Sequence, residues 1–444
     1  SLHHHSHLAL SYYTSPFDKA IGLSIDGVGE SHTIYAAMCD PFGFHKIQTL
    51  HFPHSLGLIY SAFTAYLGFK PNEGEYKVMG LAPYGDNQKY NNIFDKVATI
   101  GGEIDVVKMD MSYFTWHTSD NDMFNNKLID LIGFPPRFKD EPIEQHHKDL
   151  AASLQRWYES ALYFIINRIT NTWECENLVL GGGCAYNGTA NGKIKHFTAI
   201  KNVFIPFAPS DSGSAIGACL YHYHQTFGNP KVKGGDNQSP YLGEEWSSPE
   251  LLKLILQNHR RKVIMFDTSE ILCKEVAKLI EQGNIIGWFQ GRTEFGARAL
   301  GNRSILGNPH LSDIRDRINK VVKKREMFRP FAPTVTIEDY QKYFLSEEDV
   351  PYMNQVVKVK KGVNIPSVTH VDNSARIQTL KREDNSLYYE LLKEFEKLTG
   401  TPILLNTSFN LKDHTMTNDP QKAIWTFHNC DMDYLVMGKF LISK

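Results

Sequence analysis

The histidines near the start of the chain have spacings that suit metal binding. His3 and His7 are four residues apart, so in a helix their imidazoles lie one turn apart on the same face. Two imidazoles in that arrangement can share one cation, as they do on the helices of zinc proteases. A purification tag or a set of surface histidines is the alternative, although Ser6 interrupts the run and an apolar segment follows directly.

Two aspartates are placed where they would complete such a site. Asp26 ends the strand-like run 20–25, and α/β sheets hold their ligands at the carboxyl ends of strands. Asp211 lies between another predicted strand and a helix, at the same expected edge of the sheet. Aspartate is also a common helix N-cap, so Asp211 alone decides nothing. Two histidines and two aspartates together form a mixed nitrogen and oxygen donor set that suits iron, zinc or manganese.

A glycine-rich loop, Gly181–Gly183, lies between a predicted strand at 177–180 and a predicted helix at 188–196. Glycines at such a junction let backbone N–H groups approach a phosphate, near the positive end of the helix. Asn187, just after the loop, has an amide that could hydrogen-bond a ribose or a base. A tight packing turn is the alternative interpretation.

The segment from residue 292 to 329 is rich in basic side chains. They are Arg292, Arg298, Arg303, Arg315, Arg317, Lys320, Lys323, Lys324, Arg325 and Arg329. Arginines set among glycines suit a polyanion such as a nucleoside triphosphate. A solvated basic helix explains part of the run equally well. Arg298 and Arg303, however, stand among Gly, Ala and Leu, and because a buried unpaired charge is costly, an anionic ligand is the simpler explanation for both.

Two polar turns later in the chain also follow predicted strands. His370–Arg376 adds one more arginine, and Asn406–Asn410 adds hydroxyl and amide groups. Each of these signals is weak alone. Their expected positions at strand ends make them candidates for the same anion site.

The predicted elements divide the chain into two α/β parts. Residues 20–52 form three strands of an antiparallel meander, and Ser55 caps the apolar helix that follows. A long helix over 141–170 precedes the glycine-rich loop. Residues 226–260, rich in Gly, Pro, Asn and Ser, predict a linker. From residue 261 to 444 a second alternation of strands and helices predicts another α/β domain.

Composition excludes several classes of protein. The 444 residues are 42% hydrophobic and 22% charged, which is ordinary for a globular protein, and the formal net charge of −2 gives no overall attraction to nucleic acid. The cysteines are scattered without a CxxC pair, which favours reduced thiols and a cytoplasmic location. No segment has the apolar length of a membrane span or the pattern of a signal peptide, so we expect no membrane partner.

The ordered motifs resemble the O-carbamoyltransferases of antibiotic and nodulation-factor biosynthesis, of the tobramycin, cephamycin and novobiocin type. The resemblance extends over almost the whole chain. The matching motifs are His3–His7, Ser15–Phe17, Asp26–Glu30, Tyr76–Gly85, Gly181–Asn187, Asp211–Gly213, Phe295–Ser304, Arg325–Pro333, His370–Arg376 and Asn406–Asn410.

The resemblance implies a fold and a reaction. It implies an actin-like, or ribonuclease H-like, metal-binding domain over 1–225, N-terminally incomplete, a linker at 226–260, and a YrdC-like domain over 261–444, with the last helix and strand as candidates to pack back on the first domain. The YrdC-like domain would condense carbamoyl phosphate with ATP, as its Mg²⁺ complex, to carbamoyl-adenylate. The actin-like domain would then transfer the carbamoyl group to a hydroxyl of a sugar or natural-product acceptor. A homodimer is one alternative for the oligomeric state.

The resemblance also implies roles for individual residues. His3, His7, Asp26 and Asp211 match metal ligands, most simply for Fe²⁺, with Zn²⁺ or Mn²⁺ as alternatives. Gly182, Gly183 and Asn187 match the loop that holds the adenylate. Arg298, Lys323, Arg376 and Ser408 match positions around carbamoyl phosphate and ATP, with Arg303 and Arg329 as neighbours. The adjacent Lys324 leaves the register at Lys323 open by one residue.

In one respect the chain departs from the family, and this departure leads us to expect adenylate formation but not carbamoyl transfer. Family members carry an N-terminal segment before the histidine cluster, with a His-Asp motif proposed to activate the acceptor hydroxyl. We therefore expect this chain to be a truncation, a fragment or one part of a split protein, able to form carbamoyl-adenylate but lacking the base for transfer. The alternatives are a threonylcarbamoyl-type tRNA-modifying enzyme, which the near-neutral charge disfavours, and a regulator that binds metal and nucleotide without turnover.

Overall fold

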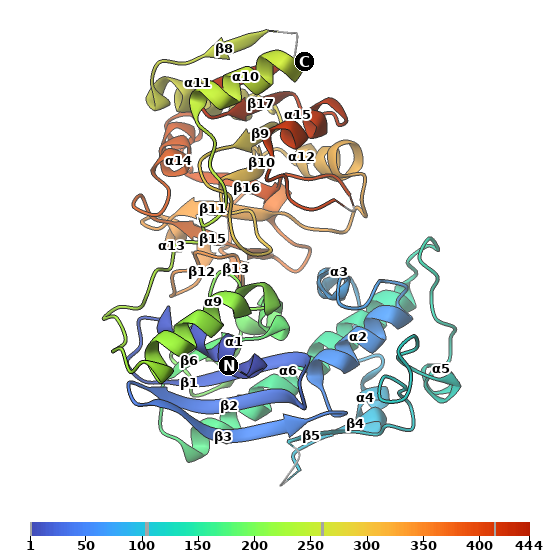
Figure 1. The fold of residues 1–444 in the computed structure, drawn as a ribbon. Helices are drawn as coiled ribbons and strands as arrows, with labels where there is room; N and C mark the ends of the chain where they lie inside the picture. Colours follow the sequence, from blue (N-terminus) through green and yellow to red (C-terminus); the bar gives the residue numbers. More distant parts are fainter. Residues whose placement is uncertain (1, 103–105, 259–261, 413) are drawn as a thin grey trace. The chain divides into compact units, whose positions relative to one another are not determined.

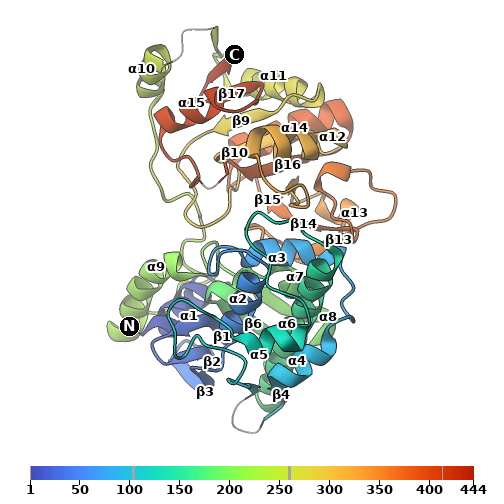
Figure 2. The same cartoon turned by 90° about the vertical axis from the view of Figure 1, so that its right-hand side faces the viewer.

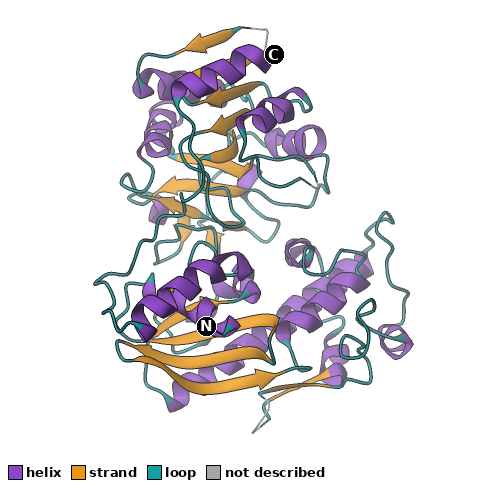
Figure 3. Cartoon of the chain, in the orientation of Figure 1, coloured by secondary structure: helices purple, strands orange, loops and turns teal. Residues whose placement is uncertain are grey.

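The computed structural model describes residues 2–102, 106–258, 262–412 and 414–444, and these form two compact units (Figure 1). The first unit is Ser1–Gln238 and the second is Ser239–Lys444. The division falls inside the segment 226–260 that the sequence assigns to a linker. Each unit is a mixed α/β structure built around its own sheet. Figure 3 shows the helices in purple and the strands in orange.

The first unit is organised on a five-stranded sheet with the order β3-β2-β1-β6-β7. Its strands are β1 (Ala20–Gly29), β2 (His32–Asp40), β3 (Gly43–His51), β6 (Asn177–Gly181) and β7 (Asn202–Phe204). The first three are antiparallel, which confirms the predicted meander, and β6 and β7 run parallel to β1. Because β1 and β6 are parallel neighbours, their carboxyl ends lie at the same edge of the sheet.

Helices cover both faces of this sheet (Figures 1 and 2). On one face α1 (His3–Tyr13) packs on β1 and β6, and α9 (Asp211–Tyr221) packs on α1. The long helix α6 (Gln145–Thr172) lies on the other face, beside α2 (Leu56–Tyr66). Ser55 accepts a hydrogen bond from the backbone of Leu58, which confirms it as the N-cap of α2.

The polar stretch before α6 forms short elements. They are α3 (Glu75–Leu81), η1 (Ala82–Tyr84), α4 (Asn91–Val97), β4 (Ala98–Ile100), β5 (Val107–Met109) and α5 (Asn126–Ile132). After β6 the glycine-rich loop contains η2 (Gly183–Tyr186), and two short helices, α7 (Gly188–Asn191) and α8 (Ile194–Phe197), replace the single helix predicted at 188–196. The π-helical turn η3 (His222–Thr226) follows α9.

The second unit contains an eight-stranded sheet with the order β15-β11-β16-β10-β9-β17-β18-β8. Its strands are β8 (Val263–Met265), β9 (Ile286–Phe289), β10 (Arg303–Gly307), β11 (Ala332–Thr336), β15 (Gln378–Leu380), β16 (Ile403–Ser408), β17 (Tyr434–Met437) and β18 (Phe440–Ser443). A smaller sheet joins β12 (Phe344–Leu345), β13 (Val356–Val359) and β14 (Ser374–Arg376). Sequence reasoning missed β10, because it gave the basic segment no strand.

Two helical layers enclose the large sheet. Helices α11 (Ser269–Glu281) and α14 (Ser386–Thr399) share one apolar core with Trp288 and Leu404. On the other face lie α10 (Ser248–Asn258), α12 (Asp313–Arg317) and α15 (Pro420–His428), in a core with Phe289 and Leu405. The short elements η4 (Ile318–Lys323), α13 (Tyr340–Tyr343) and η5 (Pro366–Val368) complete the unit.

Two sequence-based expectations need correction here. The predicted linker contains α10, whose Leu251 and Ile255 are buried in the core of the second unit; its apolar spacing was hidden by the polar composition around it. The last helix and strand were expected to return to the first domain, but β17 pairs with β9 inside the second sheet, and α15 packs on α10. The mixed α/β class is confirmed, and the actin-like and YrdC-like assignments stay predictions.

Candidate functional site

Helix α1 places His3 and His7 on one face, as the four-residue spacing predicts. Its orientation on the sheet is fixed by His4, which is buried and does not join the other two. His4 Nδ1 lies 2.8 Å from Ser24 Oγ, and His4 Nε2 lies 3.0 Å from the carbonyl oxygen of His32. Of the clustered histidines, His4 therefore anchors the helix, while His3 and His7 are available for chemistry.

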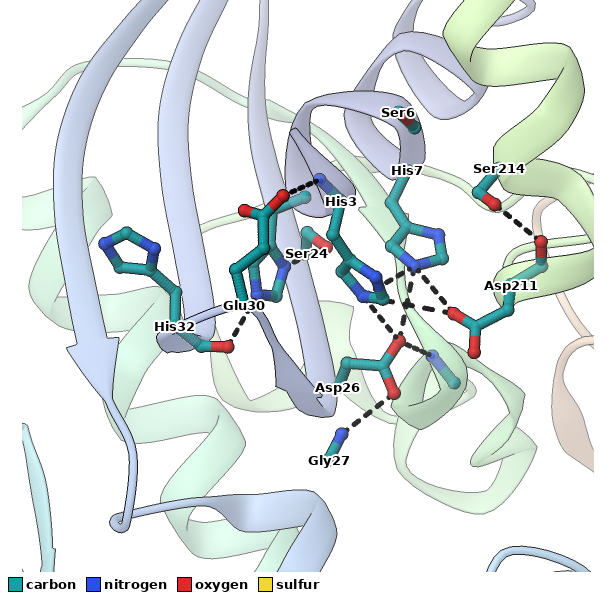
Figure 4. Close-up of polar contacts among 12 residues, drawn as sticks. His3, Ser6, His7, Ser24, Asp26, Gly27, Glu30, His32, Asp211 and Ser214 are labelled. Carbon is teal, nitrogen blue, oxygen red and sulfur yellow. Dashed lines mark hydrogen bonds and ion pairs between the residues drawn. The ribbon is translucent and has the colours of Figure 1, made fainter. Parts of the chain in front are cut away.

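His3, His7, Asp26 and Asp211 point toward one another from α1, β1 and the start of α9 (Figure 4). The Nε2 atoms of His3 and His7 are 3.1 Å apart. Asp26 Oδ2 lies 3.4 Å from His3 Nε2 and 3.3 Å from His7 Nε2, and Asp211 Oδ1 lies 3.9 Å and 3.3 Å from the same atoms. The four side chains singled out in the sequence thus form one cluster.

The separations within the cluster fit ligands of a single ion. Donor atoms about 2.1 Å from a transition metal are about 3.0 Å apart in an octahedral shell and about 3.4 Å apart in a tetrahedral one. All four donor atoms lie within 4.8 Å of one another. The side chain of His7 is 0% exposed and that of Asp211 is 77% exposed, so the cluster is closed at α1 and open to a ligand beside Asp211.

Asp26 is held in its charged form by the residues around it. Its Oδ1 accepts a hydrogen bond from the amide of Gly27 at 2.8 Å, and its Oδ2 accepts one from the amide of Gly183 at 3.0 Å. Burial alone would raise the pKa of Asp26, but its bonds to His3 and His7 outweigh burial and lower that pKa. The same bond to Asp26 raises the pKa of His3.

Two glycines in α9 allow Asp211 to reach the histidines. A Cβ atom on Gly217 would lie 1.9 Å from the carbonyl oxygen of Ser6, and one on Gly213 would lie 1.9 Å from that of Ala208 and 2.5 Å from Leu10. Only glycine therefore permits α9 to approach α1 this closely. Asp211 is the first residue of α9, with Ser210 as its N-cap, so the position of α9 sets the position of this carboxylate.

The glycine-rich loop is built into the same cluster. Gly182 has a φ of +85°, and a Cβ atom there would lie 2.1 Å from the carbonyl oxygen of Ile25. Gly183 donates to Asp26, as described above. Asn187 accepts from the amide of Ala190 at 3.1 Å and exchanges two hydrogen bonds with Gln155, at 3.0 and 3.1 Å. These contacts agree with the packing-turn interpretation of the loop, and its contact with a nucleotide stays a prediction.

A second cluster, in the second unit, surrounds Lys323. This lysine is buried at the end of η4, and its ammonium group donates to the carbonyl of Ser408, to Ser408 Oγ at 3.3 Å and to Asn410 Oδ1 at 2.5 Å. Burial, with Arg325 and Arg329 nearby, lowers the pKa of Lys323 well below its usual value. Lys323, and not the exposed Lys324, is thus the lysine of this cluster.

Arg376, a half-buried cation, belongs to the same cluster, which we call the basic cluster: Arg298, Lys323, Arg325, Arg329 and Arg376. Burial lowers the pKa of Arg376 well below its usual value, and repulsion from Arg298, Arg325 and Arg329 adds to the shift. Arg376 Nε is buried and makes no hydrogen bond within the described part of the chain. Five cations lie close enough to lower one another's pKa, and Glu326, 3.6 Å from Arg329, is the carboxylate paired with them in the described part of the chain, so this cluster has the character of an anion site.

Arg303 differs from the arginines of the basic cluster. It is 0% exposed, and its guanidinium donates to the carbonyl oxygens of Gln290, Asn302, Glu244 and Gly291. Its guanidinium carbon lies 3.7 Å from the centre of the Phe289 ring. Backbone carbonyls therefore satisfy this buried cation, so the prediction that Arg303 needs an anionic ligand to compensate its charge is wrong, while its place beside the ATP site stays a prediction.

The loop that carries Arg298 is tied to the sheet by buried polar groups. Glu294 Oε1 accepts from the amides of Leu300, Asn302 and Arg303. Gln378 donates to the carbonyl of Leu300 at 3.0 Å, and Asn406 donates to that of Ala299 at 3.2 Å. Asn406, which the sequence placed among ligand-binding candidates, thus contacts protein groups that fix the loop.

Sequence reasoning did not single out three residues that the structure brings to the basic cluster. Arg325, Asn410 and His370 all fell within the quoted motifs, but no individual role was assigned to them. The signals that could have found Arg325 and Asn410 are their positions two residues after Lys323 and Ser408. No comparable sequence signal indicates a role for His370, because its hydrogen bonds depend on the hairpin described below.

Comparison with known proteins identifies the family. A model described as carbamoyltransferase N-terminus matches residues 1–220, and one described as carbamoyltransferase C-terminus matches residues 277–444. The chain belongs to the carbamoyltransferase family. Nodulation protein NolO of Bradyrhizobium diazoefficiens is 36% identical over all of this chain and 78% of its own length. This carbamoyltransferase is also similar to an uncharacterized Synechocystis protein, at 39% identity over all of the chain and 75% of that protein.

Two further comparisons complete the description of this carbamoyltransferase. The 3'-hydroxymethylcephem-O-carbamoyltransferase of Streptomyces clavuligerus is 32% identical over 54% of this chain and 44% of its own length. The crystal structure of HypF from T.kodakarensis matches 51% of this chain and 37% of that one with 12% identity and a TM-score of 0.28, which is too weak to assign a fold. Among the described residues, no helix has the length and apolar character to cross a membrane.

Proposed function

We propose that this carbamoyltransferase is an ATP-dependent O-carbamoyltransferase that works in two steps. In the second unit, water releases phosphate from carbamoyl phosphate, and the resulting carbamate attacks the α-phosphorus of ATP, bound as its Mg²⁺ complex, to form carbamoyl-adenylate and release pyrophosphate. In the first unit, the carbamoyl group is transferred to a hydroxyl of a small-molecule acceptor, a sugar or another natural product. The single observation that carries the proposal is the basic cluster, because five cations whose charges repel one another favour a phosphate-rich ligand.

The basic cluster supplies what adenylate formation needs. Arg298, Arg325, Arg329 and Arg376 would neutralise the phosphates of ATP and of carbamoyl phosphate. Lys323 adds a point charge, and its hydrogen bonds to Ser408 and Asn410 fix the position of the ammonium group. ATP and carbamoyl phosphate are both anions, so their repulsion opposes binding them next to each other. The cations of the basic cluster reduce this repulsion, and they also stabilise the negative charge that develops during the reaction.

The first unit supports the transfer step. His3, His7, Asp26 and Asp211 would hold a transition metal, most simply Fe²⁺, with Zn²⁺ or Mn²⁺ as alternatives, because their donor atoms have suitable types and separations. A cation held there supplies positive charge that can orient a phosphate and polarise an oxygen. The chain's own contribution is to fix that position, through the bonds of Asp26 to Gly183 and Gly27.

The hydroxyl acceptor rests on the relatives. The name of the Streptomyces clavuligerus relative states carbamoyl transfer to oxygen of a hydroxymethyl cephem, and two other relatives are named nodulation proteins. From these relatives we propose for this chain only the class of acceptor, which is a hydroxyl on a small molecule. A tRNA-modifying role lacks such support.

Pyrophosphate release tests the proposal. The chain is incubated with ATP and Mg²⁺, with carbamoyl phosphate, or with both, and pyrophosphate is measured by a coupled assay. We expect release only when both are present, and its loss in Arg376→Met, which removes a cation of the basic cluster. Arg292→Ala, outside that cluster and exposed, is the matched control and should retain release. Binding of ATP without any dependence on carbamoyl phosphate would support the regulator alternative.

A further inference from the structure

His370 lies in a tight hairpin that brings it beside Arg376. The amide of His370 donates to the carbonyl of Ser374 at 2.7 Å, and Asn373, with a φ of +59°, makes the turn. The imidazole Nδ1 lies 3.0 Å from Ser374 Oγ. Ser374 and Arg376 are two residues apart on β14 and so share a face of the strand, and the charge of Arg376 acts on the His370 ring.

The hydrogen bonds of the hairpin decide which nitrogen of His370 carries the proton. Ser374 Oγ lies 2.6 Å from Asp372 Oδ1, and because a carboxylate only accepts, the Ser374 hydroxyl must donate to it. Lys358 holds the other oxygen of Asp372 at 3.2 Å. Ser374 Oγ is therefore left to accept from Nδ1–H of His370. The remaining ring nitrogen, Nε2, carries a lone pair and no proton.

That lone pair has no hydrogen-bond partner in the described part of the chain. His370 Nε2 is buried and makes no hydrogen bond to any residue that the structure describes. Burial also lowers the pKa of His370 to about 4, so the ring stays neutral at pH 7. The lone pair on Nε2 is therefore not removed by protonation. Arg376 Nε, beside it, is buried and unbonded too. A buried acceptor and a buried donor, close enough for the charge of Arg376 to act on His370, thus each need a partner that the described residues do not provide.

The chemistry of these two groups defines their ligand. The Arg376 guanidinium needs an acceptor, which a phosphate or carbonyl oxygen supplies. The His370 lone pair needs an N–H or O–H within the same small region. Carbamoyl phosphate carries both, because its amino group is its only hydrogen-bond donor and lies a few bonds from its phosphate. We propose that His370 Nε2 accepts a hydrogen bond from the carbamoyl amino group and so selects carbamoyl phosphate over acyl phosphates that lack one.

This inference rests on the proposed function, since it assigns a selectivity to the same anion site. ATP carries donors as well, on its ribose and adenine. Those groups are separated from the γ-phosphate by the triphosphate chain, whereas His370 adjoins the cationic group itself. The carbamoyl amino group is therefore the donor that the position of His370 favours, and recognition of the nucleotide becomes an outcome that the experiment separates.

Two stable ligands isolate the hydrogen bond. Phosphonoacetamide and acetonylphosphonate have the same shape and differ in one group, an amino group in the first and a methyl group in the second. Titration calorimetry with the full chain gives the ratio of their dissociation constants. We expect the wild type to bind phosphonoacetamide at least about tenfold more tightly, because acetonylphosphonate leaves a buried acceptor unpaired. His370→Phe should reduce the ratio to about one, since it removes the lone pair but keeps an aromatic ring.

His370→Gln is the matched variant, because its side-chain oxygen can accept the same hydrogen bond. It should restore at least part of the preference, and ATP affinity should be unchanged in both variants, which also confirms that they fold. An unaltered ratio in His370→Phe, with phosphonoacetamide still bound, overturns this inference and leaves the proposed function standing. A loss of ATP affinity with an unaltered ratio assigns His370 to the nucleotide and also overturns it. No binding of phosphonoacetamide or carbamoyl phosphate by the wild type overturns both proposals.

Discussion

Gly217 in α9 and Ser6 in α1 approach so closely that a Cβ atom on the glycine would lie 1.9 Å from the serine carbonyl oxygen. This contact joins the helix that carries His3 and His7 to the helix that begins with Asp211. The metal-ligand candidates come from separate parts of the sequence, and this glycine contact brings two of those parts together. The geometry of the cluster therefore depends on a residue that contributes no ligand.

The contact predicts a specific effect of Gly217→Ala. The added methyl group forces α9 away from α1, which should cost about 1–3 kcal/mol of stability and move Asp211 away from His7. We expect affinity for Fe²⁺ or Zn²⁺ to fall by about tenfold or more, as it does when groups that position metal ligands are altered. Metal titration followed by calorimetry measures the change.

Cys219→Ala is the control, because Cys219 is exposed on the same helix. It should leave metal affinity at the wild-type value. Pyrophosphate release, which we assign to the second unit, should be unchanged in both variants. Wild-type metal affinity in Gly217→Ala would contradict the role of Asp211 as a ligand.

Arg303 and Arg376 predict opposite effects on stability and binding. Arg303→Met removes the hydrogen bonds of a buried guanidinium to four backbone carbonyl oxygens, of which those of Asn302 and Glu244 keep a backbone amide partner, so we expect a loss of about 3–5 kcal/mol in urea unfolding. Arg376→Met removes a half-buried cation whose charged neighbours repel it, so stability should be unchanged or higher. Its affinity for ATP and carbamoyl phosphate should fall, and equal destabilisation by both substitutions would refute the distinction drawn between them.

The neutral state of His370 predicts a pH dependence of stability. Its pKa is lowered from 6.5 to about 4 in the folded chain, so between these values the unfolded chain binds a proton that the folded chain does not. Stability conferred by the neutral ring is complete above about pH 6.5 and is lost as the pH falls toward 4. By linkage, His370 should cost up to about 2 kcal/mol between pH 7 and pH 5.

Urea unfolding at the two pH values, compared between wild type and His370→Gln, measures this contribution. The variant should lose less stability on acidification, since it has no titrating group at this position. Identical losses in the two proteins would show that His370 is not held neutral by its surroundings.

The sequence predicted the elements whose signals are local. The spacing of His3 and His7, the cap at Ser55 and the three strands before it depend on neighbouring residues, and all agree with the structure. The grouping of Asp26 with Asp211 could also be predicted, because both follow strands that were expected at one sheet edge. Helix boundaries differ by a few residues where caps were misassigned, as at Asp211, which begins α9 while Ser210 caps it.

Features that depend on distant partners could not be predicted. Arg303 looked like Arg298 in the sequence, and only the folded chain brings the carbonyl of Glu244 to it. Helix α10 was missed because it lies within a polar segment, and only the folded chain shows that its Leu251 and Ile255 enter the core of the second unit. The unpaired nitrogen of His370 follows from the directions of the hydrogen bonds within a hairpin. Composition and periodicity do not predict those directions.

Isotope exchange between labelled pyrophosphate and ATP tests the central claim most directly, because it requires reversible formation of an adenylate. With the wild-type chain we predict that label enters ATP only when carbamoyl phosphate is present, and that Lys323→Met abolishes the exchange while the exposed Lys324→Met retains it. No exchange in the wild type, or exchange that is independent of carbamoyl phosphate, would contradict the assignment of carbamoyl-adenylate formation to this chain.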